Sequence, residues 1–293
     1  MLGVLLFNMS GVVGAKDIIN PSSRMSSLEK ESGRKIGVYA IDTNTGEVFS
    51  HRANEFFPVQ STFKLLVASY LLKASETNPE LLNKKIAITE NVMVPWHPIT
   101  GRYLPNGNMS LKSLAQAAMS YSDNTATNLI MKELGGPKAL TQFAHSIGND
   151  SFNLEHYEVK LNSNPSLSID SSTPEDMAKT LQKILFGDVL SKQSKKIIFS
   201  WMKENTTGKG KIRGGLPSGW EVADKTGAGS YGIVNDIGIV WSSACKPIVL
   251  AIYTVSNDEN AQRSNEPVSQ TTKLVLDAFS KRNPCINVSK NSG

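Results

Sequence analysis

Segments with strand character lie near both ends of this chain, and a long stretch with helical character separates them. The predicted strands combine apolar and β-branched residues with flanking turn signals and lie at residues 35–41, 47–50, 220–226, 233–241 and 247–255. An Asn-Thr-Gly turn at residues 44–46 joins the first two into a hairpin, and a closing helix is predicted over about residues 269–280. Hairpins and meanders pair antiparallel, so the two ends are expected to form one antiparallel sheet covered by helices.

The intervening stretch, residues 60–205, is mainly helical in pattern. Its clearest helices have capping signals and cover residues 111–119 after Ser110, the segment from Gly136-Pro137 to Gly148, and residues 177–186 after Thr173-Pro174. The sequence therefore predicts the α+β class, with an all-α domain inserted into a sheet domain. The junction of the two parts is the expected ligand site.

Charge and the few cysteines and histidines exclude several functions. The net charge is +5, from 31 basic and 26 acidic residues, and no run holds five or more like charges. This argues against a nucleic-acid partner. The four histidines lack paired spacing and the two cysteines form no CxxC motif. Neither a metal site nor a cofactor is therefore predicted.

The first residues have the character of an export signal. Residues 1–15 are uncharged and largely apolar and end in Val-Gly-Ala, which is typical of a secretory signal peptide cleaved near Ala15. An N-terminal strand is the alternative. No later stretch reaches about 18 apolar residues, so no membrane anchor is expected after cleavage. The protein would be periplasmic or secreted, where Cys245 and Cys285 could form a disulfide or remain free.

A serine three residues before a lysine is the first arrangement here that could carry chemistry. The spacing begins at Ser27, Ser32, Ser61, Ser200 and Ser243. Ser61 differs from the others because the apolar run of residues 63–72 follows it. Residues i and i+3 of a helix share a face, so the amine of Lys64 would lie near the Ser61 hydroxyl and could accept its proton.

Two further motifs follow Ser61. Ser122-Asp123-Asn124 lies between predicted helices, and Lys225-Thr226-Gly227 ends the strand that begins at Trp220. Taken singly, the first could be a helix N-cap and the second a strand followed by a turn. In the order SxxK, SDN and KTG they are the motif set of class A β-lactamases and penicillin-binding proteins, and the chain resembles a class A serine β-lactamase.

The resemblance extends over nearly the whole chain. Glu158 to Asn162 matches the ExxLN element of the family's Ω-loop, expected at about residues 153–171, and Asp170 matches the end of that loop. Several stretches look most like the class A carbapenemases. The resemblance implies a discontinuous sheet domain of residues 16–54 and 206–293 and an all-α domain of residues 55–205.

The same resemblance implies catalytic roles. Ser61 would attack the lactam carbonyl, and the backbone N–H groups of Ser61 and Ala228 would form the oxyanion hole. Ser122 would pass a proton to the departing nitrogen, and Glu158 would activate the water that cleaves the acyl-enzyme. Either Lys64 or Glu158 would be the base in acylation.

Substrate-binding roles are implied for a second set of residues. Asn124 would hold the substrate's side-chain amide, and Asn162 would help to place the water. Lys225 and Thr226 would bind the substrate carboxylate. The full set is Trp96, Asn124, Asn162, Lys225, Thr226, Gly227 and Lys211.

Three departures from the family pattern stand out. His156 replaces an arginine that commonly pairs with the loop aspartate, so the Ω-loop is expected to soften above neutral pH, where histidine is uncharged. Gln60 and Gly229 occupy the positions of the carbapenemase disulfide, which is therefore absent. Lys211, or alternatively Arg263, would supply the additional cation for the carboxylate, and a lysine offers a point charge in place of a bidentate fork.

Two other functions are compatible with the shared motifs. A penicillin-binding D,D-peptidase would acylate on Ser61 but lacks a deacylating glutamate, and a penicillin-sensing domain would bind without turnover. The ExxLN element favours a hydrolase with a small-molecule β-lactam substrate, and the resemblance implies a monomer.

Overall fold

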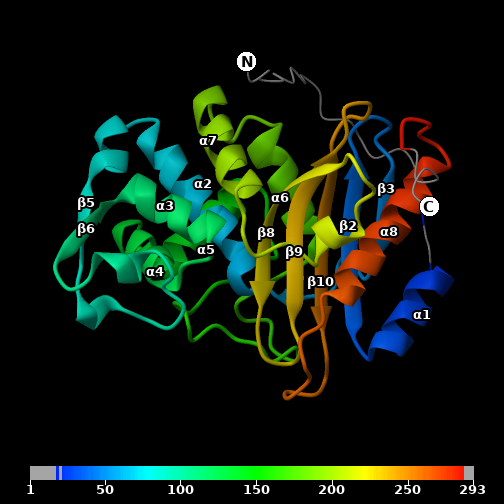
Figure 1. Cartoon of the computed structure of the whole chain (residues 1–293), viewed down its shortest axis with the longest axis horizontal. Helices are drawn as coiled ribbons and strands as arrows, with labels where there is room; N and C mark the ends of the chain where they lie inside the picture. The colour runs from blue at the N-terminus through cyan, green and yellow to red at the C-terminus, as the bar shows by residue number, and fades with distance from the viewer. Residues whose placement is uncertain (1–17, 20–21, 287–293) are drawn as a thin grey trace.

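The structure, a computed structural model, describes residues 18–19 and 22–286. Its centre is a six-stranded sheet in the order β1-β3-β2-β10-β9-β8, seen in Figure 1. The strands are β1 (Ile18–Ile19), β2 (Lys35–Asp42), β3 (Val48–His51), β8 (Glu221–Ala228), β9 (Val234–Trp241) and β10 (Ile248–Val255). All neighbours pair antiparallel except β1 and β3, which are parallel. The predicted antiparallel sheet and the α+β class are confirmed.

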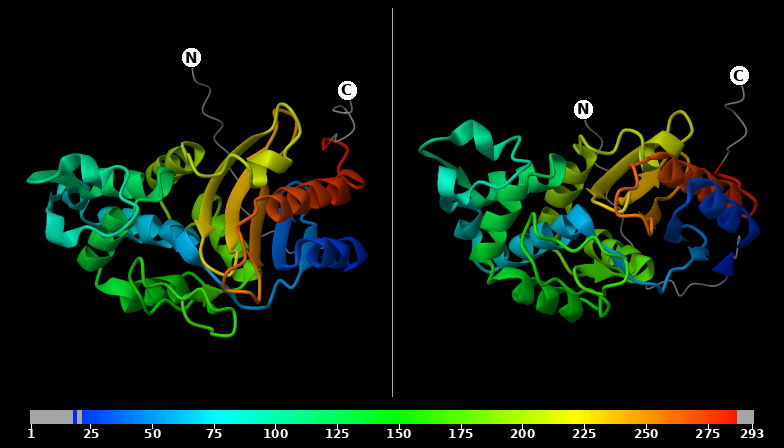
Figure 2. Two further views of the ribbon diagram at one scale, coloured as in Figure 1. Left: turned by 60° about the horizontal axis from the view of Figure 1, so that its bottom comes forward. Right: turned by 90° about the horizontal axis from the view of Figure 1, so that it is seen from below.

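The sheet separates two apolar cores because successive residues of a strand point to opposite faces. On β10, Leu250 and Ile252 pack toward α1 (Ser22–Ser32) and α8 (Glu266–Ser280). Ala251 and Tyr253, the intervening residues, belong to the core shared with the helical part. Figure 2 shows α1 and α8 on one face of the sheet, together with the short 3₁₀ helix Ile212–Gly215, and the other helices between β3 and β8 on the opposite face.

The helical part consists of elements that connect β3 to β8. Its helices are α2 (Lys64–Ser75), α3 (Leu111–Ser120), α4 (Asn124–Glu133), α5 (Gly136–Ser146), α6 (Pro174–Leu185) and α7 (Lys192–Lys203). The predicted caps are present: Ser110 accepts a hydrogen bond from Ser113 N, and Thr173 accepts one from Asp176 N. Most of α2 is buried, as expected of a helix that is apolar on all sides.

The structure contains short elements that the sequence patterns did not predict. The helical part includes two small sheets, β5 (Lys85–Ile88) with β6 (Gly107–Ser110) and β4 (Phe57–Pro58) with β7 (Ser171–Ser172). Helix α1 was also not predicted. The expected signal peptide, residues 1–15, lies outside the described residues. Within residues 18–19 and 22–286, no helix combines the length and apolarity needed to cross a bilayer.

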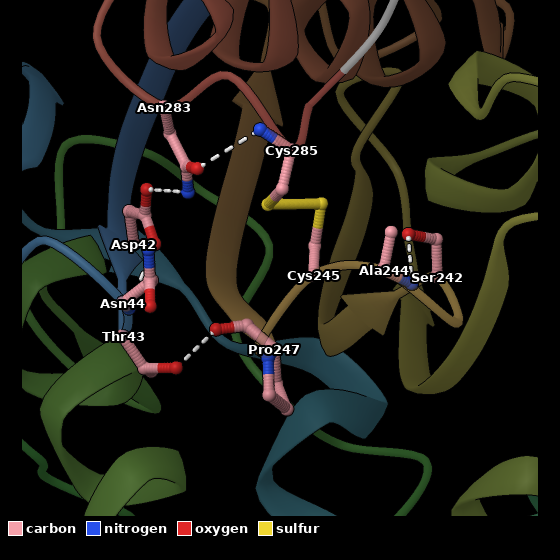
Figure 3. Close-up of a disulfide and its surroundings, with 9 residues drawn as sticks. All are labelled: Asp42, Thr43, Asn44, Ser242, Ala244, Cys245, Pro247, Asn283 and Cys285. Carbon is pink, nitrogen blue, oxygen red and sulfur yellow. Dashed lines mark hydrogen bonds between the residues drawn. A yellow bond between two sulfur atoms is a disulfide. The ribbon is translucent and has the colours of Figure 1, made fainter.

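Cys245 and Cys285 form a disulfide, so the bonded alternative holds (Figure 3). The bond joins the loop between β9 and β10 to the segment after α8, with Cα atoms 5.5 Å apart. Nearby, the Asn283 side chain donates to the Asp42 carboxylate at 2.7 Å. The covalent link therefore holds the segment after α8 against the loop between β9 and β10.

We expect the double variant Cys245→Ser/Cys285→Ser to lose about 3–4 kcal/mol of unfolding free energy. The bridge spans 40 residues of sequence, and its loss restores the chain entropy of that loop in the unfolded state. Urea denaturation of oxidised protein would measure the difference. The turnover per folded molecule should not change, since no candidate site residue lies in either linked segment. An unaltered midpoint would contradict the prediction.

Candidate active site

Ser61 lies in a 3₁₀ turn, Gln60–Phe63, that runs directly into α2. Its Oγ donates a hydrogen bond to Oε1 of Glu158 at 3.1 Å. The two residues are 97 positions apart in the sequence. The contact places a carboxylate against the hydroxyl that the SxxK motif singled out.

Lys64 is completely buried one turn further along. Its Nζ lies 3.0 Å from Glu158 Oε1, the same oxygen that accepts from Ser61. It also donates to the backbone oxygen of Ser122 at 2.9 Å and to Asn124 Oδ1. The sequence predicted direct proximity of the Lys64 amine and the Ser61 hydroxyl. In the structure Glu158 connects them, and a proton can pass between serine and lysine through its carboxylate.

The hydroxyl of Ser122 lies between two buried lysines. Lys64 Nζ approaches Ser122 Oγ at 3.3 Å from α2, and Lys225 Nζ approaches it at 3.2 Å from β8. Ser122 itself has a φ of 57°, a left-handed conformation in the turn between α3 and α4. Such strain is often retained at functional sites. This hydroxyl can exchange a proton with either amine.

Burial disfavours the charged form of both lysines. Desolvation lowers the pKa of Lys64 below its usual value, and the Glu158 carboxylate partly opposes the change. Desolvation also lowers the pKa of Lys225, well below the ordinary range, and the nearby Lys64 charge adds to the effect. Each amine therefore releases its proton more readily than a surface lysine does, and an anionic group bound beside it favours the charged form again.

Two buried carboxyl groups lie behind Lys225. Burial raises the pKa of Asp224, which precedes Lys225 on β8. Burial and the proximity of Asp224 raise the pKa of Asp236, on β9, well above its usual value. The raised pKa values favour the neutral forms of Asp224 and Asp236. The two carboxyl groups therefore carry less negative charge near Lys225 than two solvent-exposed aspartates would.

The end of β8 passes close to the nucleophile. A Cβ atom added to Gly227 would lie 3.2 Å from the backbone nitrogen of Ser61 and 3.0 Å from Val59 O. Only a glycine permits this approach of one backbone to another. Ala228, the expected second oxyanion donor, follows as the last residue of β8.

Asp170 organises the Ω-loop, residues 153–171. Its Oδ1 accepts from the backbone nitrogens of Glu155 and His156 at 2.8 and 3.1 Å. Its Oδ2 accepts from the Asn162 backbone nitrogen at 2.8 Å and lies 2.8 Å from the His156 ring nitrogen Nδ1. The expected pairing of His156 with Asp170 is present.

Both polar atoms of the Asn162 side chain are engaged within the Ω-loop. Nδ2 donates to the backbone oxygens of Asn164 and Ile169 at 3.1 and 3.0 Å, and Oδ1 accepts from Asn164 N at 2.9 Å. The structure thus joins Asn162 to loop backbone, and the expected contact with a water beside Glu158 stays a prediction.

Asn128 holds Glu158 and was not identified from the sequence. Its carboxamide donates to Glu158 O at 2.7 Å and accepts from Glu158 N at 3.0 Å. Asn128 lies four residues after Asn124 on α4, hence on the same helix face. That spacing was the available signal.

The expected substrate-binding residues surround this cluster. Trp96 is 61% exposed, and its indole N–H donates to Tyr121 O at 3.1 Å. Lys211 donates to Thr207 O at 2.7 Å, and the Thr207 hydroxyl is hydrogen-bonded to that of Thr226. Arg263, the alternative cation, donates to Gly229 O at 3.0 Å. Both cations thus connect to the end of β8, and binding of the substrate carboxylate by either one stays a prediction.

The contact of His156 with Asp170 is expected to stabilise the Ω-loop. The Asp170 carboxylate is fully buried, while the His156 side chain is 44% exposed. His156→Ala removes the ring nitrogen that lies 2.8 Å from Asp170 Oδ2, so amide protection factors of residues 155–169 should be lower in the variant than in the wild type at the same pH. Equal protection of the loop in the two proteins would disprove the idea. The expected softening of the loop above neutral pH stays a prediction.

One serine hydroxyl against a carboxylate, beside a second serine hydroxyl between two buried amines, defines a serine enzyme of acyl transfer. Among the described residues, no group of three or more His, Cys, Asp or Glu side chains could hold a metal ion.

Comparison with known proteins identifies the family. Residues 20–279 match the beta-lactamase enzyme family. The chain is 42% identical to Beta-lactamase 3 of Bacillus cereus over 88% of its length and 81% of that protein. It is 41% identical to Carbapenem-hydrolyzing beta-lactamase KPC of Klebsiella oxytoca over 87% of both. A beta-lactamase crystal structure from Desulfarculus baarsii gives a TM-score of 0.86 at 36% identity, over 88% of this chain and 96% of that one.

The chain belongs to the beta-lactamase enzyme family. It is a hydrolase that acts on β-lactams, the activity by which such enzymes cause antibiotic resistance. The class A assignment drawn from the three motifs agrees with these matches.

Proposed function

We propose that the enzyme hydrolyses penicillins, and some cephalosporins, through an acyl-enzyme on Ser61. The observation that carries the proposal is the shared oxygen: Glu158 Oε1 accepts from Ser61 Oγ at 3.1 Å and lies 3.0 Å from Lys64 Nζ. A nucleophile, a carboxylate and an amine in mutual contact provide for both formation and hydrolysis of an ester.

In acylation, the proton of Ser61 Oγ leaves toward Glu158 or Lys64 as the oxygen bonds to the lactam carbonyl carbon. The N–H groups of Ser61 and Ala228 stabilise the oxyanion. The lactam C–N bond breaks, and Ser122 Oγ gives its proton to the nitrogen. Lys64 and Lys225, each within 3.3 Å of Ser122 Oγ, are the sources that restore that proton.

In deacylation, Glu158 takes a proton from a water molecule as the water oxygen bonds to the ester carbonyl carbon. The bond from that carbon to Ser61 Oγ then breaks, and Glu158 returns the proton to Ser61 Oγ. Lys225 and Thr226 bind the substrate carboxylate, with Lys211 or Arg263 as an additional cation. Asn124 and Trp96 contact the acyl side chain. We further propose that residues 16–54 and 206–293 form one domain and residues 55–205 a second one. The mature enzyme would act as an exported monomer.

Steady-state hydrolysis of nitrocefin tests the proposal against its main alternatives. A hydrolase turns over many equivalents, whereas a D,D-peptidase gives one burst and a sensor domain remains acylated. The contact of Glu158 with Ser61 favours the hydrolase, since a carboxylate there can activate water. A panel of one penicillin, one cephalosporin and one carbapenem would then rank the substrates. Poor carbapenem turnover is expected, because Gln60 and Gly229 replace the disulfide found in carbapenemases.

A further inference from the structure

Gln60 connects the nucleophile to the Ω-loop. It directly precedes Ser61, is 6% exposed, and has a φ of 45°. Its Nε2 donates to Asn162 O at 2.9 Å and to Ser163 Oγ at 3.0 Å. The backbone of Gln60 is therefore continuous with the nucleophile, while its carboxamide is bound to the loop that carries Glu158.

The loop residue that Gln60 contacts is itself well fixed. The Asn162 backbone nitrogen donates to Asp170, and its side chain binds backbone atoms on both sides of the loop turn. Glu158 lies four residues before Asn162 in the loop, and the Asn128 side chain on α4 is hydrogen-bonded to both its backbone N–H and its backbone oxygen. The Ω-loop is thus held from α4 at Glu158 and from the nucleophile turn at Asn162.

Strand β8 and the residue after it leave the Gln60 side chain little freedom. A Cβ atom added to Gly229 would lie 2.8 Å from Gln60 Cδ and 2.9 Å from Oε1. One added to Gly227 would lie 3.0 Å from Gln60 Cβ. The carboxamide therefore lies between the chain after β8 and the Ω-loop, and moving it requires one of them to move.

We infer that Gln60 is a positioning residue for deacylation, which sets the distance between Ser61 and Glu158 through its hydrogen bonds to Asn162 and Ser163. The inference rests on the proposed acyl-enzyme mechanism. Deacylation is the sensitive step because water must fit between the Ser61 ester and the Glu158 carboxylate, and a displacement of the loop changes that gap directly. The groups that serve Ser122 in acylation belong to α2, the turn before α4, and β8. The Gln60 carboxamide donates its hydrogen bonds to the Ω-loop and to none of these groups.

The variant Gln60→Met tests this role, since methionine has similar length but no N–H donor. The deacylation rate constant should fall about tenfold or more, because a misplacement of about 1 Å at a reacting centre can cost about 100-fold in rate. The acylation rate constant should stay within about threefold. Since kcat/KM reports acylation, kcat and KM should fall together while kcat/KM is retained. Stopped-flow nitrocefin kinetics and mass spectrometry of quenched samples give both rate constants per active site.

Two further variants separate positioning from general destabilisation. Ser163→Ala removes one acceptor, so it should slow deacylation less, and the double variant should be no slower than Gln60→Met alone. Gln116→Met removes a surface bond to Glu204 and should change neither step. A wild type without turnover would reject the proposed function. A wild type that turns over, with an unchanged deacylation rate or equal losses in both steps in Gln60→Met, would reject the positioning role alone.

Discussion

Glu158→Ala is expected to form an acyl-enzyme with penicillin and then to release product about 1,000-fold more slowly than the wild type, the scale of a lost general base. The reason is geometric. Glu158 Oε1 lies 3.1 Å from Ser61 Oγ, so its carboxylate adjoins the position of the ester and of any water that attacks it. Alanine leaves Ser61, Lys64 and Ser122 in place but removes the proton acceptor.

Intact-protein mass spectrometry measures this result directly. Ring opening expels no leaving group, so the trapped species should carry the full mass of one penicillin. Glu155→Ala is the matched control, because Glu155 is an exposed carboxylate in the same loop; it should turn over normally. Rapid and complete hydrolysis by Glu158→Ala would remove Glu158 from the mechanism.

The sheet could be predicted closely because its strands carry their own signal. The segments at residues 233–241 and 247–255 became β9 and β10 with nearly the same limits. Helix α1 lacks such a signal: among its residues 23–32 only Met25 is buried, and the rest are mainly polar. The β5–β6 pair is short and largely exposed on β5, so its pattern does not rise above that of a loop.

Site residues that belong to a short sequence motif could be predicted from the sequence, and site residues outside such motifs could not. Ser61, Ser122 and Lys225 belong to short motifs, and the structure brings them together around Lys64. Gln60 and Asn128 act through hydrogen bonds to residues 102 and 30 positions away. Those contacts depend on how the Ω-loop folds back, which no local spacing encodes. The same folding places Glu158 between Ser61 and Lys64.

Lys64→Met should reduce the acylation rate constant by about 1,000-fold, a loss typical of removing a general base and its proton relay. Methionine fits the buried position in size but neither accepts a proton nor supplies one to Ser122. The matched control is Lys73→Met on the same helix, whose exposed amine pairs with Glu76 at 3.2 Å. That variant should acylate at the wild-type rate. Thermal unfolding of both variants would verify that each is folded.

The pH dependence of acylation identifies the base. Burial lowers the pKa of Lys64 from its ordinary value of 10.5, so the neutral amine persists to lower pH than in a surface lysine. If that amine is the base, acylation falls as pH drops through the lowered pKa and is constant above it, and Lys64→Met loses this limb. The Glu158→Ala variant should then still acylate on the same limb, because the Ser61 hydroxyl, released from the carboxylate, can turn toward the Lys64 amine one helical turn along. Should Lys64→Met acylate as fast as the wild type while Glu158→Ala does not, the carboxylate alone would be the base, and the buried amine would serve only to return the proton through Ser122.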